Sequence, residues 1–427
     1  MLRVLTAYQN RIRDMAVYLT ASFIPMLLSL LINPLVAKNM SPNDYAIVGY
    51  YKSFSTLLLP FIQFYVLHYY TKSYYELQEE QRRVLKATIF KFLIYGSGAI
   101  SVICLFGLIG YTVCFNDNTL IPLAPYIYLS IFSLPLTGVY QLTLLELKMS
   151  RQSGVFFCYS IAYSLLTFFL TWLLIVKLQQ GAFGSMMSIF AANAVIFIYC
   201  CYNYRDLFRI PFNYAYLKII LFFCAPLTLA AMLSFFSGGY ERVYLERLGN
   251  IDELGYYIVG ATMAGYIQVF SNALGSTFQP DIFKAIVNRD RRQYLKYCAV
   301  MLGATIFIVA GVVAFAPFIM DILTAGRYVY SAKYMQLIAL SCVSSSIYYM
   351  VSQFTIAIGL PKITFYNKIL GSILSILMYK ILIDKWHFYG AAIGVIVSFI
   401  IFALGNIALL YTCLLYTSDA ADELDGV

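Results

Sequence analysis

The chain alternates between long apolar runs and short polar segments, and twelve of the apolar runs are long enough to cross a bilayer. A spanning helix needs about 20 mostly apolar residues, and a helix satisfies its own backbone hydrogen bonds in lipid. The runs lack the alternation over about 10 residues that a β-barrel strand would show. We therefore predict an all-α, polytopic membrane protein with spans at 16–37, 45–67, 88–113, 121–147, 155–176, 182–203, 219–240, 253–276, 298–323, 334–358, 364–383 and 389–413.

The second six runs repeat the first six at a nearly constant offset. Three pairs of segments match: Tyr45-Ala-Ile-Val-Gly49 with Tyr256-Tyr-Ile-Val-Gly260, Arg82-Arg-Val-Leu-Lys86 with Arg291-Arg-Gln-Tyr-Leu-Lys296, and Gly181-Ala-Phe-Gly184 with Gly390-Ala-Ala-Ile-Gly394. Because six spans per half is an even number, both halves insert with the same orientation. We predict two parallel six-helix repeats, an N-terminal lobe at 1–204 and a C-terminal lobe at 219–413, joined by a linker at 205–218. In transporters, such halves rock about a central cavity.

The basic residues are sorted by loop. The chain is 61% hydrophobic and 11% charged, with a net charge of +9. Only nine of its 29 lysines and arginines lie outside the segments that we predict to be cytoplasmic: Lys38, Lys52, Lys177, Arg242, Arg247, Arg327, Lys333, Lys380 and Lys385. The positive-inside bias predicts that both termini are cytoplasmic. This sorting points to membrane lipids as partners of the basic residues, and not to nucleic acid.

Lys52 is the charge that this pattern places deepest in the membrane. It lies eight residues beyond Asp44, roughly 12 Å into an apolar layer about 30 Å thick. Polar residues recur at helical spacing on the same span and on two others, and they are Ser55, Thr56 and Gln63; Ser22, Ser29 and Asn33; and Gln268, Asn272 and Ser276. Such stripes either line a wet cavity or hydrogen-bond between packed helices. For Lys52 we favour the cavity, because a buried amine needs water or an anion.

Sequence motifs of enzymes are missing from the chain. There is no H-E-x-x-H, P-loop, G-x-S-x-G or dinucleotide fingerprint, and the nine cysteines form no C-x-x-C pair. The two histidines, His68 and His387, are predicted at opposite membrane faces. These patterns favour transport over catalysis and predict no metal site and no bound cofactor, while coupling to a proton or sodium gradient stays open.

The chain resembles bacterial polysaccharide-biosynthesis flippases, the Wzx-type translocases of O-antigen and capsule repeat units in the multidrug/oligosaccharidyl-lipid/polysaccharide exporter superfamily. The resemblance covers about residues 10–413. It is carried by the doubled layout, by Asn39-Met-Ser-Pro-Asn-Asp-Tyr-Ala-Ile-Val-Gly49 and its counterpart Gly249-Asn-Ile-Asp-Glu-Leu-Gly-Tyr-Tyr-Ile-Val-Gly260, and by Gly359-Leu-Pro-Lys362 and Gly390-Ala-Ala-Ile-Gly394. Family members more often have Phe-Gly where this chain has Tyr45-Ala46.

The resemblance implies a V-shaped transporter that turns an undecaprenyl-pyrophosphate-linked oligosaccharide across the bacterial cytoplasmic (inner) membrane by alternating access. A polymerase and other polysaccharide-assembly proteins would be partners. From its position, we assign Lys52 to the pyrophosphate or to an acidic sugar. Three alternatives stay open: a multidrug or organic cation antiporter, which should have a deep acidic residue; a membrane glycosyltransferase or polymerase, which should have a large outer loop; and a lipid II flippase, which usually has fourteen spans and several deep arginines.

The composition changes abruptly after the last apolar run. Residues 414–427 begin with Leu414-Leu-Tyr-Thr-Ser-Asp-Ala-Ala-Asp-Glu423, an acidic stretch unlike the rest of the chain. It is typical of translated sequencing adapter, while an ordinary disordered cytoplasmic tail is the alternative. We predict a non-native tail here and base no functional argument on it.

Overall fold

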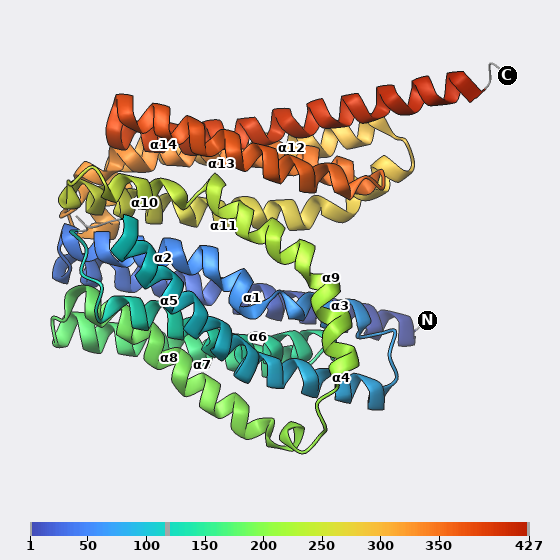
Figure 1. Ribbon diagram of the computed structural model, residues 1–427, viewed down its shortest axis with the longest axis horizontal. Helices are drawn as coiled ribbons and strands as arrows, with labels where there is room; N and C mark the ends of the chain where they lie inside the picture. The colour runs from blue at the N-terminus through green and yellow to red at the C-terminus, as the bar shows by residue number, and fades with distance from the viewer. Residues whose placement is uncertain (1, 116–119, 425–427) are drawn as a thin grey trace. The chain divides into compact units, whose positions relative to one another are not determined.

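The computed structural model describes residues 2–115 and 120–424, and within these ranges the chain is helical without any β-strand (Figure 1). The chain forms two compact units. Unit 1 comprises Met1–Met232 and the short segment Leu323–Arg327, and unit 2 comprises Leu233–Ile322 and Tyr328–Val427. The predicted all-α fold class is therefore confirmed.

Unit 1 contains one long helix for each of the first six predicted spans (Figure 1). Helix α2 packs against α6 and α8, and α1 packs against α7. A short helix, α3 (Val66–Ser73), follows α2, and a π-helical turn joins α4 to α5. The long helices are α1 (Leu2–Asn39), α2 (Pro42–Gln63), α4 (Glu79–Lys91) with α5 (Ser97–Phe115), α6 (Tyr126–Met149), α7 (Ser153–Thr171) and α8 (Gly181–Asn203).

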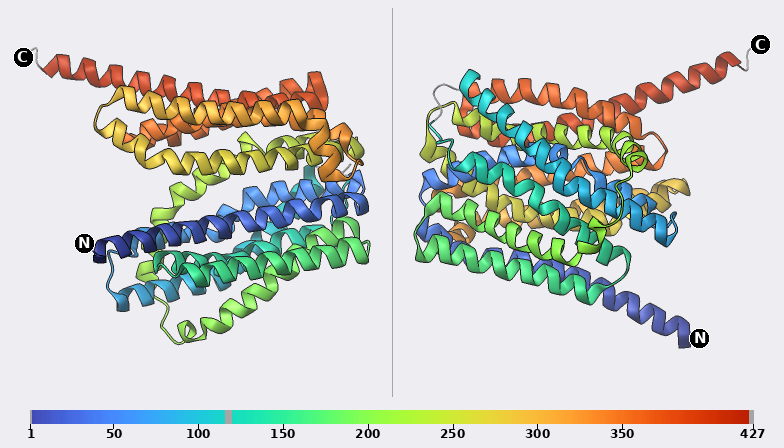
Figure 2. Two further views of the ribbon diagram at one scale, coloured as in Figure 1. Left: turned by 180° about the vertical axis from the view of Figure 1, so that it is seen from behind. Right: turned by 60° about the horizontal axis from the view of Figure 1, so that its bottom comes forward.

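Unit 2 contains the long helices of the last five predicted spans, and Figure 2 shows from two further sides that the long helices within each unit lie side by side. Its helices are α10 (Tyr240–Glu246), α11 (Ile251–Val287), α12 (Arg291–Thr324), α13 (Ala332–Ala357) and α14 (Pro361–Leu424). Helix α14 is two helices that meet at His387, whose φ of 48° and ψ of −125° are not helical. A Cβ atom at Gly390 would lie 1.9 Å from the Leu382 oxygen, so the sharp turn requires glycine. The two predicted spans 364–383 and 389–413 lie on either side of it.

Eight described helical stretches are long and apolar enough to cross a membrane. One of them, Lys362–Cys413, contains two predicted spans. Helices α2 and α11 fall short because polar side chains and tyrosines interrupt their apolar runs, and α1 contributes only the shorter apolar stretch Phe23–Asn39. The protein is thus a multi-pass membrane protein. The number of twelve crossings and the V shape stay predictions.

Helix capping supports the internal repeat at the start of α2 and of α11. Ser41 caps α2, and its Oγ accepts from the Asp44 amide at 3.2 Å. Asn250 caps α11, and its Oδ1 accepts from the Glu253 amide at 3.0 Å. Both pairs join the N-cap to an acidic residue three positions later, where a carboxylate also stabilises the helix terminus. The two caps are 209 positions apart (250 − 41), in line with the predicted offset.

The ends of α6 and α13 are also equivalent. The Gln152 amide donates to the Leu147 oxygen at 2.8 Å, and the Leu360 amide donates to the Thr355 oxygen at 3.0 Å. Between each donor and its helix lies a residue of positive φ, Arg151 at 58° and Gly359 at 85°. This is the Schellman arrangement of a helix C-terminus, repeated 208 positions apart (360 − 152).

Helix α9 (Tyr214–Leu233) begins within the predicted linker 205–218 and continues into the predicted C-terminal lobe. Residues 219–232, which we assigned to the C-terminal lobe, belong to compact unit 1. The functional lobe boundaries stay a prediction. The side chains of residues 414–427 lie outside the described part of the chain, so the predicted non-native tail also stays a prediction.

Candidate functional site

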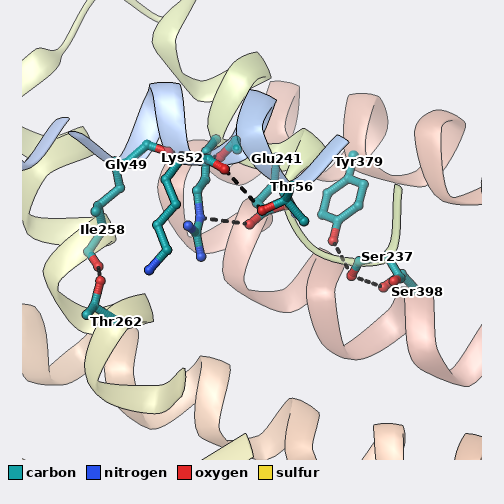
Figure 3. Close-up of polar contacts among 12 residues, drawn as sticks. Gly49, Lys52, Thr56, Ser237, Glu241, Ile258, Thr262, Tyr379 and Ser398 are labelled. Atoms are coloured by element: carbon teal, nitrogen blue, oxygen red, sulfur yellow. Dashed lines mark hydrogen bonds and ion pairs between the residues drawn. The ribbon is translucent and has the colours of Figure 1, made fainter. Parts of the chain in front are cut away.

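Lys52 projects from the middle of α2 and is exposed (Figure 3). The capping box at Ser41 and a proline at the first helical position start this helix, and the apolar run after Asp44 continues it. Thr56, also exposed, donates from its Oγ1 to the Lys52 main-chain oxygen at 3.0 Å (Figure 3). Lys52 and Thr56 therefore share one accessible face of α2, as the sequence predicts.

Ser55 and Gln63 hold α2 against α6. The Ser55 and Ser130 hydroxyls lie 2.9 Å apart. Gln63 is buried, and its Nε2 donates to the Leu134 oxygen at 3.0 Å and to Thr137 Oγ1 at 2.8 Å. In this structure both side chains act in helix packing. Their role as cavity residues stays a prediction.

The polar residues of α1 also include one that is exposed and one that is buried in helix packing. Ser29 is exposed. Asn33 is buried and donates from Nδ2 to the main-chain oxygen of Leu323 at 2.8 Å, within unit 1. The side chain of Ser22 lies outside the described part of the structure. Of this predicted stripe, only Ser29 is observed on an accessible surface.

Gln268 and Asn272 of α11 line a cavity of about 200 Å³ within unit 2. Gln268 Nε2 donates to Asn272 Oδ1 at 3.1 Å, and Ser345 of α13 donates to Gln268 Oε1 at 3.2 Å. Ser276, the third member of the predicted stripe, also lines the cavity. These polar residues lie together at one cavity, and their role in binding substrate stays a prediction.

Lys368 is a cation that the sequence analysis missed. In unit 2 its Nζ donates to Ser234 Oγ, and Ser372, one turn further along α14, donates to the Leu233 oxygen at 3.2 Å. Among the described residues, no carboxylate lies within ion-pair distance of Lys368. Its position in the apolar segment 364–383 was the available signal.

Glu241 and Glu246 of α10 are also unexpected. Their exposed fractions are only 2% and 3%, although the predicted span 219–240 ends before both of them. Glu241 accepts from the Gly239 amide and lies 3.4 Å from Arg242 Nε (Figure 3). The short 3-10 helix Ser234–Ser237 precedes α10, and the Ser237 oxygen accepts hydrogen bonds from Ser398 and Tyr379 (Figure 3). This packing buries both carboxylates.

A second charged network lies at the end of α6 in unit 1. Lys86 Nζ lies 3.3 Å from Glu146 Oε1, and the Tyr70 hydroxyl donates to the same carboxylate. The Lys86 ammonium also lies over the Tyr204 ring, 4.5 Å from its centroid. The arrangement satisfies both charges internally, so we assign it to helix packing.

The comparisons with known proteins identify the fold. No family model and no curated protein match the sequence. An inward-facing multidrug resistance MATE family transporter of the MOP superfamily aligns with a TM-score of 0.71 and 13% identity, over 92% of this chain and 98% of that chain. The lipid II flippase MurJ, in an inward closed conformation, aligns with a TM-score of 0.68 and 14% identity, over 92% of this chain and 86% of that chain.

The chain has the fold of the MOP exporter superfamily. A mutant of the Vibrio cholerae MATE transporter VcmN also aligns, with a TM-score of 0.54 and 14% identity over 97% of this chain and 98% of that chain. This is the fold that the loop motifs and the doubled layout predict. Identities of this size show the fold and leave the cargo to be argued from the residues.

Proposed function

We propose that the protein is a flippase that moves undecaprenyl-pyrophosphate-linked oligosaccharide units across a bacterial cytoplasmic membrane for surface polysaccharide assembly. The fold shared with MurJ supports this proposal, because that neighbour is described as a lipid II flippase. Alternating access between two parallel repeats would supply the movement. Both termini would be cytoplasmic, and the polymerase and other assembly proteins would be its partners.

The observation that carries the proposal is Lys52, an exposed basic residue midway along α2. A charge near the bilayer centre costs about 2.5–3.5 kcal/mol on insertion scales, so it is retained where it has a role. Lys368 adds a second cation, in unit 2, without a carboxylate partner among the described residues. Phosphate oxygens are strong partners for ammonium groups, which favours an anionic, phosphate-bearing cargo over a cationic one.

A multidrug or organic cation antiporter is the second candidate, and the fold supports it equally. The buried carboxylates of Glu241 and Glu246 favour it, because an exporter of cations needs an acidic group that can exchange cargo for a coupling ion. Glu241 has Arg242 at 3.4 Å and a backbone amide on its other oxygen. This compensation weakens the candidate.

A deletion strain separates the two candidates. Loss of the protein should raise lipid-linked oligosaccharide in the cytoplasmic leaflet and reduce surface polysaccharide, while efflux of an organic cation such as ethidium stays unchanged. The wild-type chain and Lys52→Arg should restore the polysaccharide, and Lys52→Ala should not, at equal amounts of protein in the membrane. Normal polysaccharide with lost ethidium efflux would reject the flippase and favour the antiporter.

A further inference from the structure

A pocket of about 590 Å³ lies in unit 2 where α11 and α13 end and α12 begins. We call it the Arg289 pocket. Its wall is largely apolar and includes Ile286, Leu295, Phe354 and Ile358, and Arg289 and Arg291 complete it. Leu295 is 52% exposed and Ile358 is 37% exposed. An apolar wall next to two guanidinium groups is suited to an amphiphile with a negatively charged end.

The guanidinium groups of the pocket are exposed and form no ion pair among the described residues. The carboxylate in the wall, Asp290, accepts from the Gln293 amide at 3.0 Å and so caps α12. Arg289 has a φ of 54°, in the region that favours glycine. It occupies the position of a Schellman turn, since the Asp290 amide donates to the Ala285 oxygen at 2.9 Å.

The equivalent region of unit 1 compensates its charges internally. The α6 and α13 C-termini align so that Glu146 and Phe354 each accept from the amide four residues later. Glu146 pairs with Lys86 at 3.3 Å. The Arg82 guanidinium lies over the Tyr74 ring, 4.5 Å from its centroid, and donates to the main-chain oxygen of Tyr74. In unit 2 the carboxylate is replaced by Phe354, which lines the pocket.

The two halves of the repeat therefore differ in one respect. In unit 1, Lys86 pairs with the Glu146 carboxylate, and Arg82 contacts Tyr74. In unit 2, Arg289 and Arg291 lie beside an apolar wall and form no ion pair among the described residues. The surrounding segment 284–296 carries five basic residues and one acidic residue, and its loop is predicted to be cytoplasmic. Basic pockets between membrane helices on that side suit anionic lipid headgroups.

We propose that the Arg289 pocket binds one anionic phospholipid, with the phosphate headgroup at Arg289 and Arg291 and an acyl chain along Leu295, Phe354 and Ile358. Arginine presents a planar set of donors that matches phosphate oxygens. The site does not depend on the proposed cargo, because it needs only a membrane lipid.

Native mass spectrometry of the purified full chain tests the proposal. In detergent containing equal phosphatidylglycerol and phosphatidylcholine, the wild-type chain should retain one phosphatidylglycerol with at least about fivefold preference. Arg289→Gln/Arg291→Gln should lose at least about tenfold in apparent affinity, since each basic residue near a membrane surface contributes about a fivefold gain in binding.

The matched control is Arg292→Gln/Lys296→Gln, which removes the same charge from the same segment at residues that do not line the pocket. It should retain the lipid. Equal loss in both double variants would show a diffuse basic surface and overturn the proposal, as would retention in both or equal binding of the two lipids. Displacement of the lipid by millimolar inorganic phosphate would also overturn it, by showing a phosphate site without an acyl-chain site.

All variants should first show a single monodisperse species and a thermal midpoint near that of the wild-type chain. If the arginine pair does not fold, Phe354→Asp provides the second variant, because it places a carboxylate where unit 1 has Glu146. It should abolish selective retention of phosphatidylglycerol, and unchanged retention would contradict the proposal.

Discussion

At the scale of single residues, helical periodicity does not distinguish the polar side chains that are exposed from those that hydrogen-bond to a neighbouring helix. Lys52 and Thr56 are exposed, whereas Ser55 and Gln63 of the same helix turn toward α6 and form hydrogen bonds there. The sequence could place all four on one helix, because spacing defines a face. It could not show which edge of that face meets a neighbour, since this depends on where α6 packs.

Gln63 should contribute to stability. Replacing it with leucine removes hydrogen bonds to the Leu134 oxygen and to Thr137, and interhelical hydrogen bonds in membranes contribute about 0.6 kcal/mol each. Gln63→Leu should therefore lower the free energy of unfolding by about 1 kcal/mol, measured by unfolding in mixed detergent.

The control for this change is Gln81→Leu, at an exposed position of α4 in the same unit. It should leave the unfolding midpoint nearly unchanged. Equal effects of the two substitutions would show that the α2–α6 bonds of Gln63 do not stabilise the unit.

At the scale of helices, the termini preserve the repeat most clearly. Caps at Ser41 and Asn250, and Schellman turns after α6 and α13, recur at the same places in both halves. Sequence matching found the cap regions, because they share residue types. It missed the α6 and α13 ends, because their equivalence is in backbone geometry while Glu146 and Phe354 differ chemically.

Asp44 should stabilise two helix starts together. Its Oδ2 accepts from the Ser41 amide at 2.8 Å, and its Oδ1 accepts from the Ala182 amide at the start of α8 at 2.8 Å. Loss of a cap costs about 1 kcal/mol, and an unpaired buried donor adds about as much again. Asp44→Ala should therefore lower the free energy of unfolding by about 2 kcal/mol, which is measured as a lower thermal midpoint.

The neighbouring substitution Asn43→Ala provides the comparison, because Asn43 is exposed and lies on the same first turn of α2. It should change the midpoint little. A fall as large as that of Asp44→Ala would assign the effect to helix propensity and not to the two caps.

At the scale of the whole molecule, the sequence was sufficient for the fold. Twelve apolar runs, their repetition and the loop motifs lead to the MOP exporter architecture, and the alignments with a MATE transporter and with MurJ agree. The charges within units were harder to predict. The burial of Glu241 and Glu246 depends on packing around α10 and leaves no local sequence signal. The position of Lys368 in an apolar segment is visible in the sequence, but its contact with Ser234 is not.

The central claim is that the protein moves a pyrophosphate-linked lipid and that Lys52 acts in this step. The most direct measurement is transbilayer movement of a labelled lipid-linked oligosaccharide in proteoliposomes, followed by its accessibility to an external glycosidase. We expect the wild-type chain and Lys52→Arg to move the lipid well above the rate in empty liposomes, and Lys52→Ala to be slower by at least about tenfold, roughly 1.4 kcal/mol in the barrier. Movement no faster than in empty liposomes, from protein that is folded and correctly inserted, would contradict the account.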